Sequence, residues 1–307
     1  MSAPRLSVVI PTWDGRRLLE ACLRGLRAQT LPADAYEIVV VDNGSEDGTE
    51  AWLHAAHPDV VVLRSPENLG FAEATNRGAA AARGERLVLL NNDAVPAPPF
   101  LEALERTAAG PAPAAAAVAG RILDADGRAV EFGGSELGGF GFGFQRSSWQ
   151  RGFEECEDGG ELPFACGGAM LIGRAEFLAL GGFDPDYFAY YEDVDLGWRL
   201  WLAGRRVVYA RGAEVRHERH GTGRRFSDRW RHFHWYKNAL QTLVKNAEDA
   251  YLPRLFPVAL ALLQSRVREF YAESAAAADR GDGDAARRAL EIAIGAAEGI
   301  AWVLSRM

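Results

Sequence analysis

The chain has 307 residues, 48% hydrophobic and 25% charged, a composition ordinary for a globular protein. Its net charge of -8 argues against general nucleic-acid binding, so an anionic ligand would have to be met by a local basic patch or a metal. Three scattered cysteines form neither a disulfide framework nor a metal-finger spacing, which indicates a reducing cytoplasm. The sequence enters a strand almost at once, without a signal peptide, and no apolar run reaches the roughly 18–20 residues that span a bilayer.

The first ninety residues alternate apolar runs with helical patterns. The runs predict strands at Ser7–Ile10, Ile38–Val41, Val60–Leu63 and Leu87–Leu90, and the patterns predict helices near Arg16–Ala28, Asp47–Ala56 and Phe71–Ala82. Continuous apolar strands separated by helices indicate a doubly wound, mostly parallel α/β sheet with helices on both faces. In such sheets ligands bind beyond the carboxyl ends of the strands.

Polar, turn-forming residues follow three of these strands. Asp93 ends the run Asn91-Asn92-Asp93, where a carboxylate is placed to bind a hard cation, although this run is also a common strand exit. Asp42 is either a turn former or a group that binds a ribose or base. Asn68 and Gly70, at a helix entrance, would hold a nucleotide or simply cap the helix.

The middle of the chain is less regular. An Ala/Pro-rich connection at 108–119 leads into a strand predicted at Val118–Ile122. Residues 133–160 are rich in glycine and aromatics, and a long irregular segment in a compact domain is usually a functional loop or lid. Another strand is predicted at Cys166–Ile172.

A cluster of acids follows, at Asp184, Glu192, Asp193 and Asp195 among many aromatic residues. Gly204 reads as the end of a helix, which places the last three acids in its first turn, where the helix dipole favours negative charge. Aromatic surroundings remove water from a carboxylate, raise its pKa and make it a better proton acceptor. The alternative is an acidic helix start on a solvated face.

Two histidines follow the strand-like runs Val207–Tyr209 and Ala213–Val215. His217 or His220 would share a site with Asp93 if both strands end on the same side of the sheet. Imidazole and carboxylate together suit Mn²⁺ or Mg²⁺, with phosphate oxygens and water filling the open positions.

The character of the chain changes near residue 222, after which it is mostly helical. The segment Arg211–Lys237 has eight Lys/Arg against three acids. It is either a solvated basic face or a contact for a diphosphate, a polyprenyl-phosphate acceptor or anionic lipid. In the last helix, an amphipathic pattern places one apolar face on Leu290, Ile294, Ala301 and Leu304.

Taken together, the motifs resemble those of family 2 glycosyltransferases with the GT-A fold, and most of all the branch with rhamnosyltransferases and galactofuranosyltransferases. The resemblance rests on Ser7-Val8-Val9-Ile10-Pro11-Thr12, Val41-Asp42-Asn43-Gly44-Ser45, Asn68-Leu69-Gly70, Asn91-Asn92-Asp93, Gly182-Phe183-Asp184, Glu192-Asp193-Val194-Asp195 and Val215-x-His217. It covers about residues 5–222. It implies a catalytic domain at 1–222 and a C-terminal helical region at 223–307.

The resemblance also implies roles for single residues. The nucleotide-binding set is Pro11, Thr12, Asp14, Asp42, Asn68, Gly70, Arg77 and Asn92. The metal-binding set is Asp93 and His217. Asp193 matches the catalytic base, and the substrate-binding set is Glu192, Asp195, Trp149 and Gly168. One departure is that Asn91 replaces the first acid of the family's Asp-x-Asp motif.

The implied reaction transfers a sugar from a nucleoside diphosphate, dTDP or UDP, to an acceptor hydroxyl with inversion, assisted by Mn²⁺ or Mg²⁺. The family's usual acceptors are glycans or polyprenyl-linked glycans of the cell surface. The resemblance is consistent with a cytoplasmic protein and leaves open peripheral contact with the inner membrane leaflet and a homo-oligomer.

Two other classes of protein are alternatives to a glycosyltransferase. A sugar-nucleotide pyrophosphorylase would carry a glycine-rich loop ending in a basic residue after its first strand, whereas this chain has Pro11-Thr12-Trp13-Asp14-Gly15 there. A non-catalytic carbohydrate- or nucleotide-binding module would not need Asp93, Asp193 and His217 intact.

Overall fold

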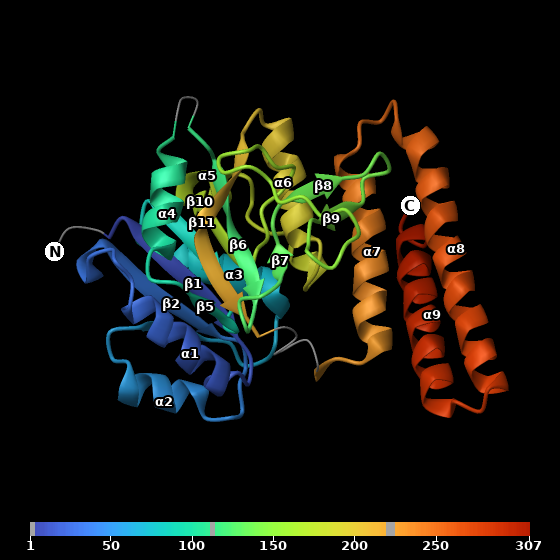
Figure 1. Cartoon of the computed structure of the whole chain (residues 1–307), viewed down its shortest axis with the longest axis horizontal. Helices are drawn as coiled ribbons and strands as arrows, with labels where there is room; N and C mark the ends of the chain where they lie inside the picture. Colours follow the sequence, from blue (N-terminus) through green and yellow to red (C-terminus); the bar gives the residue numbers. More distant parts are fainter. Residues whose placement is uncertain (1–3, 111–113, 219–224) are drawn as a thin grey trace. The chain divides into compact units, whose positions relative to one another are not determined.

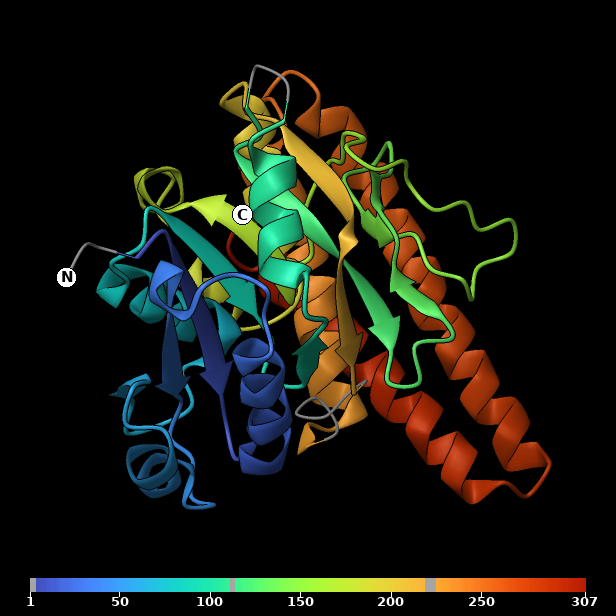
Figure 2. The same ribbon diagram turned by 60° about the vertical axis from the view of Figure 1, so that its left-hand side comes forward.

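The computed structural model describes residues 4–110, 114–218 and 225–307 (Figures 1 and 2). The chain divides into two compact units. The first comprises 1–136, 144–188 and 192–222, and the second comprises 137–143, 189–191 and 223–307. The main division falls where the composition changes, and the second unit also takes in two short segments from the middle of the chain.

The strands and helices predicted for the first ninety residues are all present. They are β1 (Leu6–Thr12), α1 (Arg16–Arg27), β2 (Tyr36–Asp42), α2 (Thr49–Ala56), β3 (Val61–Arg64), α3 (Gly70–Ala81) and β4 (Arg86–Leu90). β1 pairs in parallel with β2 and β4, and β2 with β3. Both faces of β1 are covered, because every residue from Leu6 to Ile10 has no exposed surface. Because these strands are parallel, the polar residues at their ends lie at the same carboxyl edge of the sheet.

Beyond β4 the sheet is mixed rather than mostly parallel. Its order is β3-β2-β1-β4-β10-β6-β11-β5, with β7 on β6. The added strands are β5 (Ala94–Pro96), β6 (Ala117–Asp124), β7 (Val130–Phe132), β10 (Ala169–Gly173) and β11 (Val207–His217). β10 runs antiparallel to both β4 and β6. The two strands expected at 207–215 are one strand, irregular between Ala210 and Glu214.

Shorter elements complete the first unit. They are the 3-10 turns Ala33–Ala35 and Pro185–Tyr187, and the helices α4 (Phe100–Ala108), α5 (Arg174–Ala179) and α6 (Glu192–Leu202). The small strands β8 (Ser135–Leu137) and β9 (Gly143–Gln145) are divided between the units, because Leu137 and Gly143 belong to the second. α3 packs on β1 and β2, and α4 packs on β6 and β11. α6 begins at the predicted acids. Residues 111–113 of the Ala/Pro-rich connection lie outside the described residues.

The second unit contains α7 (Asp228–Asn246), α8 (Leu252–Asp279) and α9 (Gly283–Leu304). The face predicted for α9 is wrong, because Leu290 and Leu304 are 40% and 43% exposed. The buried residues of α9 are Ala289, Ala293, Gly295, Ala296, Gly299, Ile300 and Val303. A Cβ on Gly295 would lie 2.0 Å from the carbonyl oxygen of Arg229 on α7, so small residues define the packed face. Among the described residues no helix is both long and apolar enough to cross a membrane.

Candidate active site

Hydrogen bonds join the carboxyl ends of the first, second and fourth strands. The Asn92 side-chain amide donates to Thr12 Oγ1 at 2.8 Å, and both side chains are buried. The backbone N–H of Asn43 donates to the carbonyl of Thr12 at 2.8 Å. Thr12 and Asn92 therefore fix the edge at which the resemblance places the nucleotide, and Pro11 precedes Thr12 within β1.

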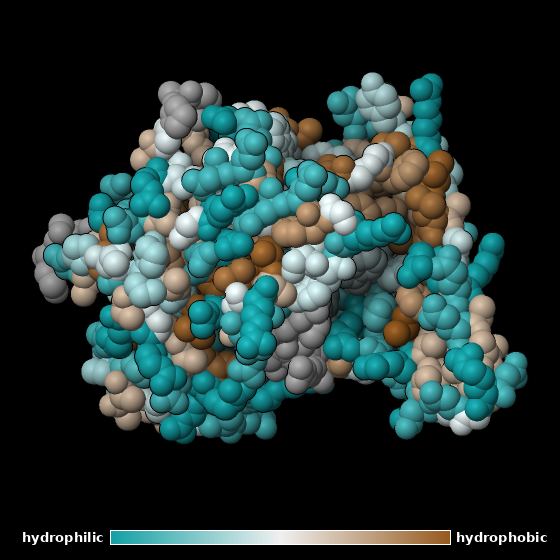
Figure 3. Space-filling model, in the orientation of Figure 1, coloured by the Kyte–Doolittle hydropathy of each residue, from teal (hydrophilic) through white to brown (hydrophobic). Residues whose placement is uncertain are grey.

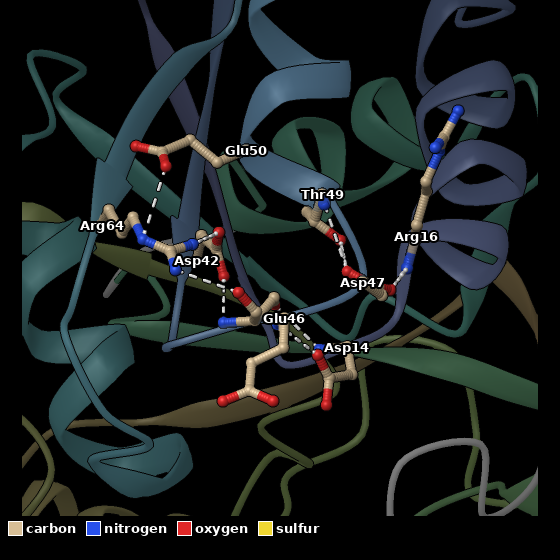
Figure 4. Close-up of polar contacts among 9 residues, drawn as sticks. Asp14, Arg16, Asp42, Glu46, Asp47, Thr49, Glu50 and Arg64 are labelled. Carbon is tan, nitrogen blue, oxygen red and sulfur yellow. Dashed lines mark hydrogen bonds and ion pairs between the residues drawn. The ribbon is translucent and has the colours of Figure 1, made fainter.

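Asp42, at the end of β2, is fully buried and shares its two oxygens between two donors (Figure 4). One oxygen accepts the Ser45 N–H at 2.9 Å and the other accepts Arg64 Nη1 at 2.5 Å. Arg64, on β3, also reaches the carbonyl of Ser45. Asp14 binds the same turn, accepting the Glu46 N–H at 2.6 Å. Arg64 was missed from the sequence, although a charged last residue on an apolar strand was a usable signal.

The third part of this edge is the entrance to α3. Asn68 Oδ1 accepts the Asn43 amide at 2.8 Å and the Gly70 N–H at 3.0 Å. Gly70 has a φ of +84°, and a Cβ there would lie 2.6 Å from Phe188. Arg77 pairs with Glu73 one turn earlier at 2.9 Å and donates to Ser65 Oγ at 3.3 Å. The expected nucleotide-binding residues thus form a hydrogen-bonded rim, and their role in binding stays a prediction.

His217 lies at the end of β11, between two carboxylates. Its Nε2 is 3.1 Å from Asp93 Oδ1, and its Nδ1 is 2.7 Å from Glu131 Oε2. His217 pairs with Ala94 in the sheet, so β11 and the Asp93 strand end do meet. Burial by itself lowers the pKa of His217. The hydrogen bonds that its ring donates to the Asp93 and Glu131 carboxylates outweigh burial and raise the pKa to about 10. Sequence reasoning missed Glu131, which is buried on β7.

Asp93 and His217 fit a divalent cation as two neighbouring ligands. Ligand distances of about 2.1–2.2 Å at right angles separate two donor atoms by about 3 Å, close to the observed spacing. Across the described ranges, no group of three or more His, Cys, Asp and Glu side chains could hold a metal ion. A cation here would therefore need oxygens from a substrate or water as its remaining ligands. His220 lies outside the described residues.

Glu192 and Asp193 form a buried acidic pair at the start of α6, being 7% and 9% exposed. Asp193 Oδ1 accepts the Val194 N–H at 2.8 Å, and Oδ2 accepts the Gly167 N–H at 3.1 Å. Burial raises the pKa of Asp193, although these N–H groups oppose it. Burial and the neighbouring Asp193 raise the pKa of Glu192 well above its usual range. Within the described chain, Glu192 Oε2 has no hydrogen-bond partner.

Two hydrogen bonds connect this pair to the strand end that carries Asp93. The N–H of Asn91 donates to the carbonyl of Gly168 at 3.1 Å, and Gly167 donates to Asp193. A Cβ on Gly168 would lie 2.8 Å from the Asn91 side chain, so a larger residue there would displace that side chain. The candidate base and the candidate cation ligand are thus held to one framework.

Asp195 does not fit its expected contact with substrate. It has no exposed surface, and Arg199 Nη2 lies 2.8 Å from its Oδ2. Arg199 also donates to the carbonyls of Leu180 and Gly182 at 2.7 and 2.8 Å. Arg199 therefore has a structural role: it ties α6 to the segment before it, and Asp195 is its counter-ion.

We expect Arg199→Met to lower the free energy of unfolding by about 3–5 kcal/mol, since it removes the cationic partner of a buried carboxylate. Arg205→Met is the matched control, because the Arg205–Glu176 pair is exposed and should contribute less than about 1 kcal/mol. Urea unfolding measures both. Equal losses in the two variants would contradict the structural role of Arg199.

The backbone before the acidic pair is strained. Phe188, Tyr190 and Tyr191 have φ values of 61°, 72° and 69°, which non-glycine residues rarely adopt. The Asn238 side chain on α7 donates to the carbonyls of Ala189 and Tyr190 at 2.9 and 2.6 Å. Such strain persists where surrounding contacts enforce it, and it is typical of functional sites. Trp149 is 48% exposed in the irregular segment, and its role stays a prediction.

The sequence of the chain is similar to those of known glycosyltransferases. A family model described as Glycosyl transferase family 2 matches residues 7–178. N-acetylglucosaminyl-diphospho-decaprenol L-rhamnosyltransferase of Mycobacterium tuberculosis is 34% identical over 246 residues, covering 71% of this chain and 78% of the relative. Validoxylamine A glucosyltransferase of Streptomyces hygroscopicus subsp. jinggangensis is 29% identical, covering 70% of this chain and 56% of the relative.

Two solved structures share the fold. The mannosyltransferase PcManGT from Pyrobaculum calidifontis, in complex with GDP-Man and Mn²⁺, superposes with a TM-score of 0.59 at 20% identity, covering 99% of this chain and 88% of that one. GalNAc-T7 with UDP, GalNAc and Mn²⁺ superposes with a TM-score of 0.57 at 18% identity, covering 79% and 48%. The predicted fold and family are confirmed: the chain is a glycosyltransferase and belongs to glycosyl transferase family 2.

Proposed function

We propose that this glycosyltransferase moves a sugar from a nucleoside diphosphate to a hydroxyl of a polyprenyl-diphosphate-linked saccharide, with inversion of the anomeric carbon. The observation that carries the proposal is the buried Glu192–Asp193 pair, joined through Gly167 and Gly168 to the strand end that holds Asp93. This connection supports the proposal, because transfer from a diphosphate requires a proton acceptor and a cation ligand at a fixed separation.

The nucleotide would lie along the rim formed by the ends of β1, β2 and β4. Asp14 would be the acceptor there for ribose or base N–H and O–H groups. Asp42 has no exposed surface, so it would instead hold Arg64 and the Ser45 turn in place beside the nucleotide. We propose a dTDP- or UDP-sugar as the donor. The sugar itself is not assigned, because relatives that transfer different sugars match this chain.

Asp93 and His217 would hold Mn²⁺ or Mg²⁺ together with the donor diphosphate. When bound, the cation stabilises the negative charge of the departing nucleoside diphosphate. The chain itself contributes the orientation of His217, because Glu131 accepts at Nδ1 and leaves Nε2 directed toward Asp93. Mn²⁺ in two structural neighbours supports this choice of ion.

Asp193 would accept the proton of the acceptor hydroxyl as that oxygen attacks the anomeric carbon. The Gly167 and Val194 N–H groups keep its carboxylate in one orientation. A single displacement inverts the anomeric carbon and needs no second nucleophile. The acceptor class is supported by the printed name of the rhamnosyltransferase that is 34% identical.

The test is transfer by the full chain to a short-chain polyprenyl-diphosphate-linked N-acetylglucosamine, using a panel of dTDP- and UDP-sugars with and without Mn²⁺. We expect one donor to give a product with inverted anomeric configuration by NMR, together with stoichiometric nucleoside diphosphate. A retained configuration would exclude the single displacement. Formation of a sugar 1-phosphate and a nucleoside triphosphate only when pyrophosphate is added would instead indicate the pyrophosphorylase reaction.

A further inference from the structure

The C-terminal unit carries an exposed apolar surface. Val258 and Leu262 on α8 are 41% and 43% exposed, whereas the neighbouring Ala259 and Leu263 are buried on the face of α8 that packs against α9 and α7. Five of the exposed apolar side chains of this unit are Tyr251, Val258, Leu262, Leu304 and Met307, and we call them the apolar end; Trp235, Tyr271 and Leu290 are also exposed but are not part of it. Isolated exposed apolar residues are ordinary, but a group of them on one element indicates an interaction site.

These residues gather at one end of a helical hairpin. α8 and α9 are joined by a short turn, and Ser274 Oγ donates to the Ala286 carbonyl at 2.7 Å, which fixes their register. The two helices are antiparallel and rise equally per residue, so residues equally far from the turn lie level with one another. Val258 is therefore level with the last turn of α9, which contains Leu304. Figure 3 shows brown surface over the upper part of α8, where the helix begins (Figure 1).

The apolar end is also the basic end of the hairpin. From Tyr251 to Arg268 the only charged residues are Arg254, Arg266 and Arg268, of which Arg266 is paired with the following Glu269, and Arg306 is the only charged residue from Gly299 to Met307. Glu248 and Asp249 precede this stretch in the connection from α7. The opposite end is mixed, with Asp279, Arg280, Asp282, Asp284, Arg287 and Arg288.

This combination favours an anionic partner over a second copy of the chain. In a two-fold dimer the same patch meets itself, so the basic ends would face one another. An anionic lipid surface offers both an apolar layer for the side chains and phosphates for the arginines.

We propose that the apolar end docks on an anionic lipid bilayer, with Val258 and Leu262 inserted at the headgroup boundary and Arg254 and Arg268 on lipid phosphates. This goes beyond the proposed function and does not rest on it, because docking needs no donor or acceptor. It places the membrane contact on α8 and α9 rather than on the basic segment 211–237. There, Arg229 and Arg231 are already paired with Glu298 and Asp228.

The test is flotation of the full chain with phosphatidylcholine vesicles that contain about 30% phosphatidylglycerol, or none, without nucleotide or sugar. We expect binding to the anionic vesicles only, weakened by salt. Val258→Glu/Leu262→Glu and Arg254→Glu/Arg268→Glu should each lower the bound fraction at least about tenfold. Leu178→Glu, at a 40% exposed position on α5, is the control and should bind normally.

Binding of the wild type to neither vesicle would overturn the proposal, as would equal loss in the Leu178→Glu control. Gel filtration tests the alternative occupant: a wild-type dimer that Val258→Glu/Leu262→Glu converts to monomer would assign the surface to self-association instead. Unchanged thermal midpoints exclude unfolding. Transfer to a soluble short-chain acceptor separates the two proposals, since vesicle binding without transfer refutes only the proposed function, and transfer without vesicle binding refutes only the docking.

Discussion

Asp193→Asn should lower kcat about 10²–10⁴-fold, the usual contribution of a positioned general base, with little change in nucleotide binding. The substitution preserves the shape of the side chain and keeps an oxygen that can accept the Gly167 N–H. What it removes is the capacity to take the proton of the acceptor hydroxyl. Single-turnover transfer measures the chemical step, and wild-type rates in this variant would exclude Asp193 as the base.

Glu192→Gln is the matched control for that experiment, and we expect it to keep kcat within about tenfold of wild type. Burial and the adjacent Asp193 raise the pKa of Glu192 well above its usual range, which favours its neutral form. Gln is also neutral and can donate one hydrogen bond to a substrate hydroxyl, as a protonated Glu does. A loss as large as that in Asp193→Asn would instead make Glu192 an essential anion.

The raised pKa of Glu192 also predicts how stability depends on pH. A carboxyl whose pKa is higher in the folded state contributes stability that is complete below its unfolded value of 4.5 and is lost as pH rises through the folded value. At higher pH the ionised Glu192 therefore opposes folding. We expect Glu192→Gln to raise Tm at pH 8 and to have a smaller effect at pH 5, which thermal unfolding at the two pH values measures.

The residues at the sheet edge could be predicted from the sequence because a polar residue follows the apolar run of each of three buried strands. Thr12, Asp42 and Asp93 follow apolar runs, and parallel strands bring such ends together. The acidic helix start was equally visible, since Glu192 and Asp193 precede a helix with a clear glycine stop. Local order along the chain was enough for these features.

Other features depend on contacts that no local pattern records. Glu131 meets His217 across 86 residues of sequence, from a strand of three residues. Its only local signal is a charge between Val130 and Phe132. Asp195 reads like its acidic neighbours; its pairing with Arg199 four residues later is a local helical signal, but only the fold brings Arg199 to the carbonyls of Leu180 and Gly182. In α9 the large residues suggested the packed face, whereas Gly295 and Gly299 are the positions where α7 approaches too closely for any side chain.

Asp93→Ala should abolish the part of nucleotide binding that depends on a divalent cation. A ligand that binds the folded chain raises Tm according to its affinity. For the wild type we expect UDP or dTDP with Mn²⁺ to raise Tm more than the two separate additions combined, because the cation and the diphosphate share one site. In Asp93→Ala the cooperative part should disappear and transfer should fall by about 10² or more. Asp59→Ala, which removes an exposed acid paired with Arg27, should behave like wild type.

Glu131→Ala tests the same site without removing a proposed ligand. Glu131 Oε2 lies 2.7 Å from His217 Nδ1, and it holds the ring so that Nε2 is directed toward Asp93. Loss of such an orienting partner typically lowers metal affinity about 10–100-fold. We therefore expect Mn²⁺ titrations in the presence of UDP or dTDP to shift to higher concentration by that factor, while the Tm increase from nucleotide alone is unchanged. A normal Mn²⁺ dependence in this variant would exclude His217 as a ligand of the cation, because freeing its ring to rotate would then have had no effect on cation binding.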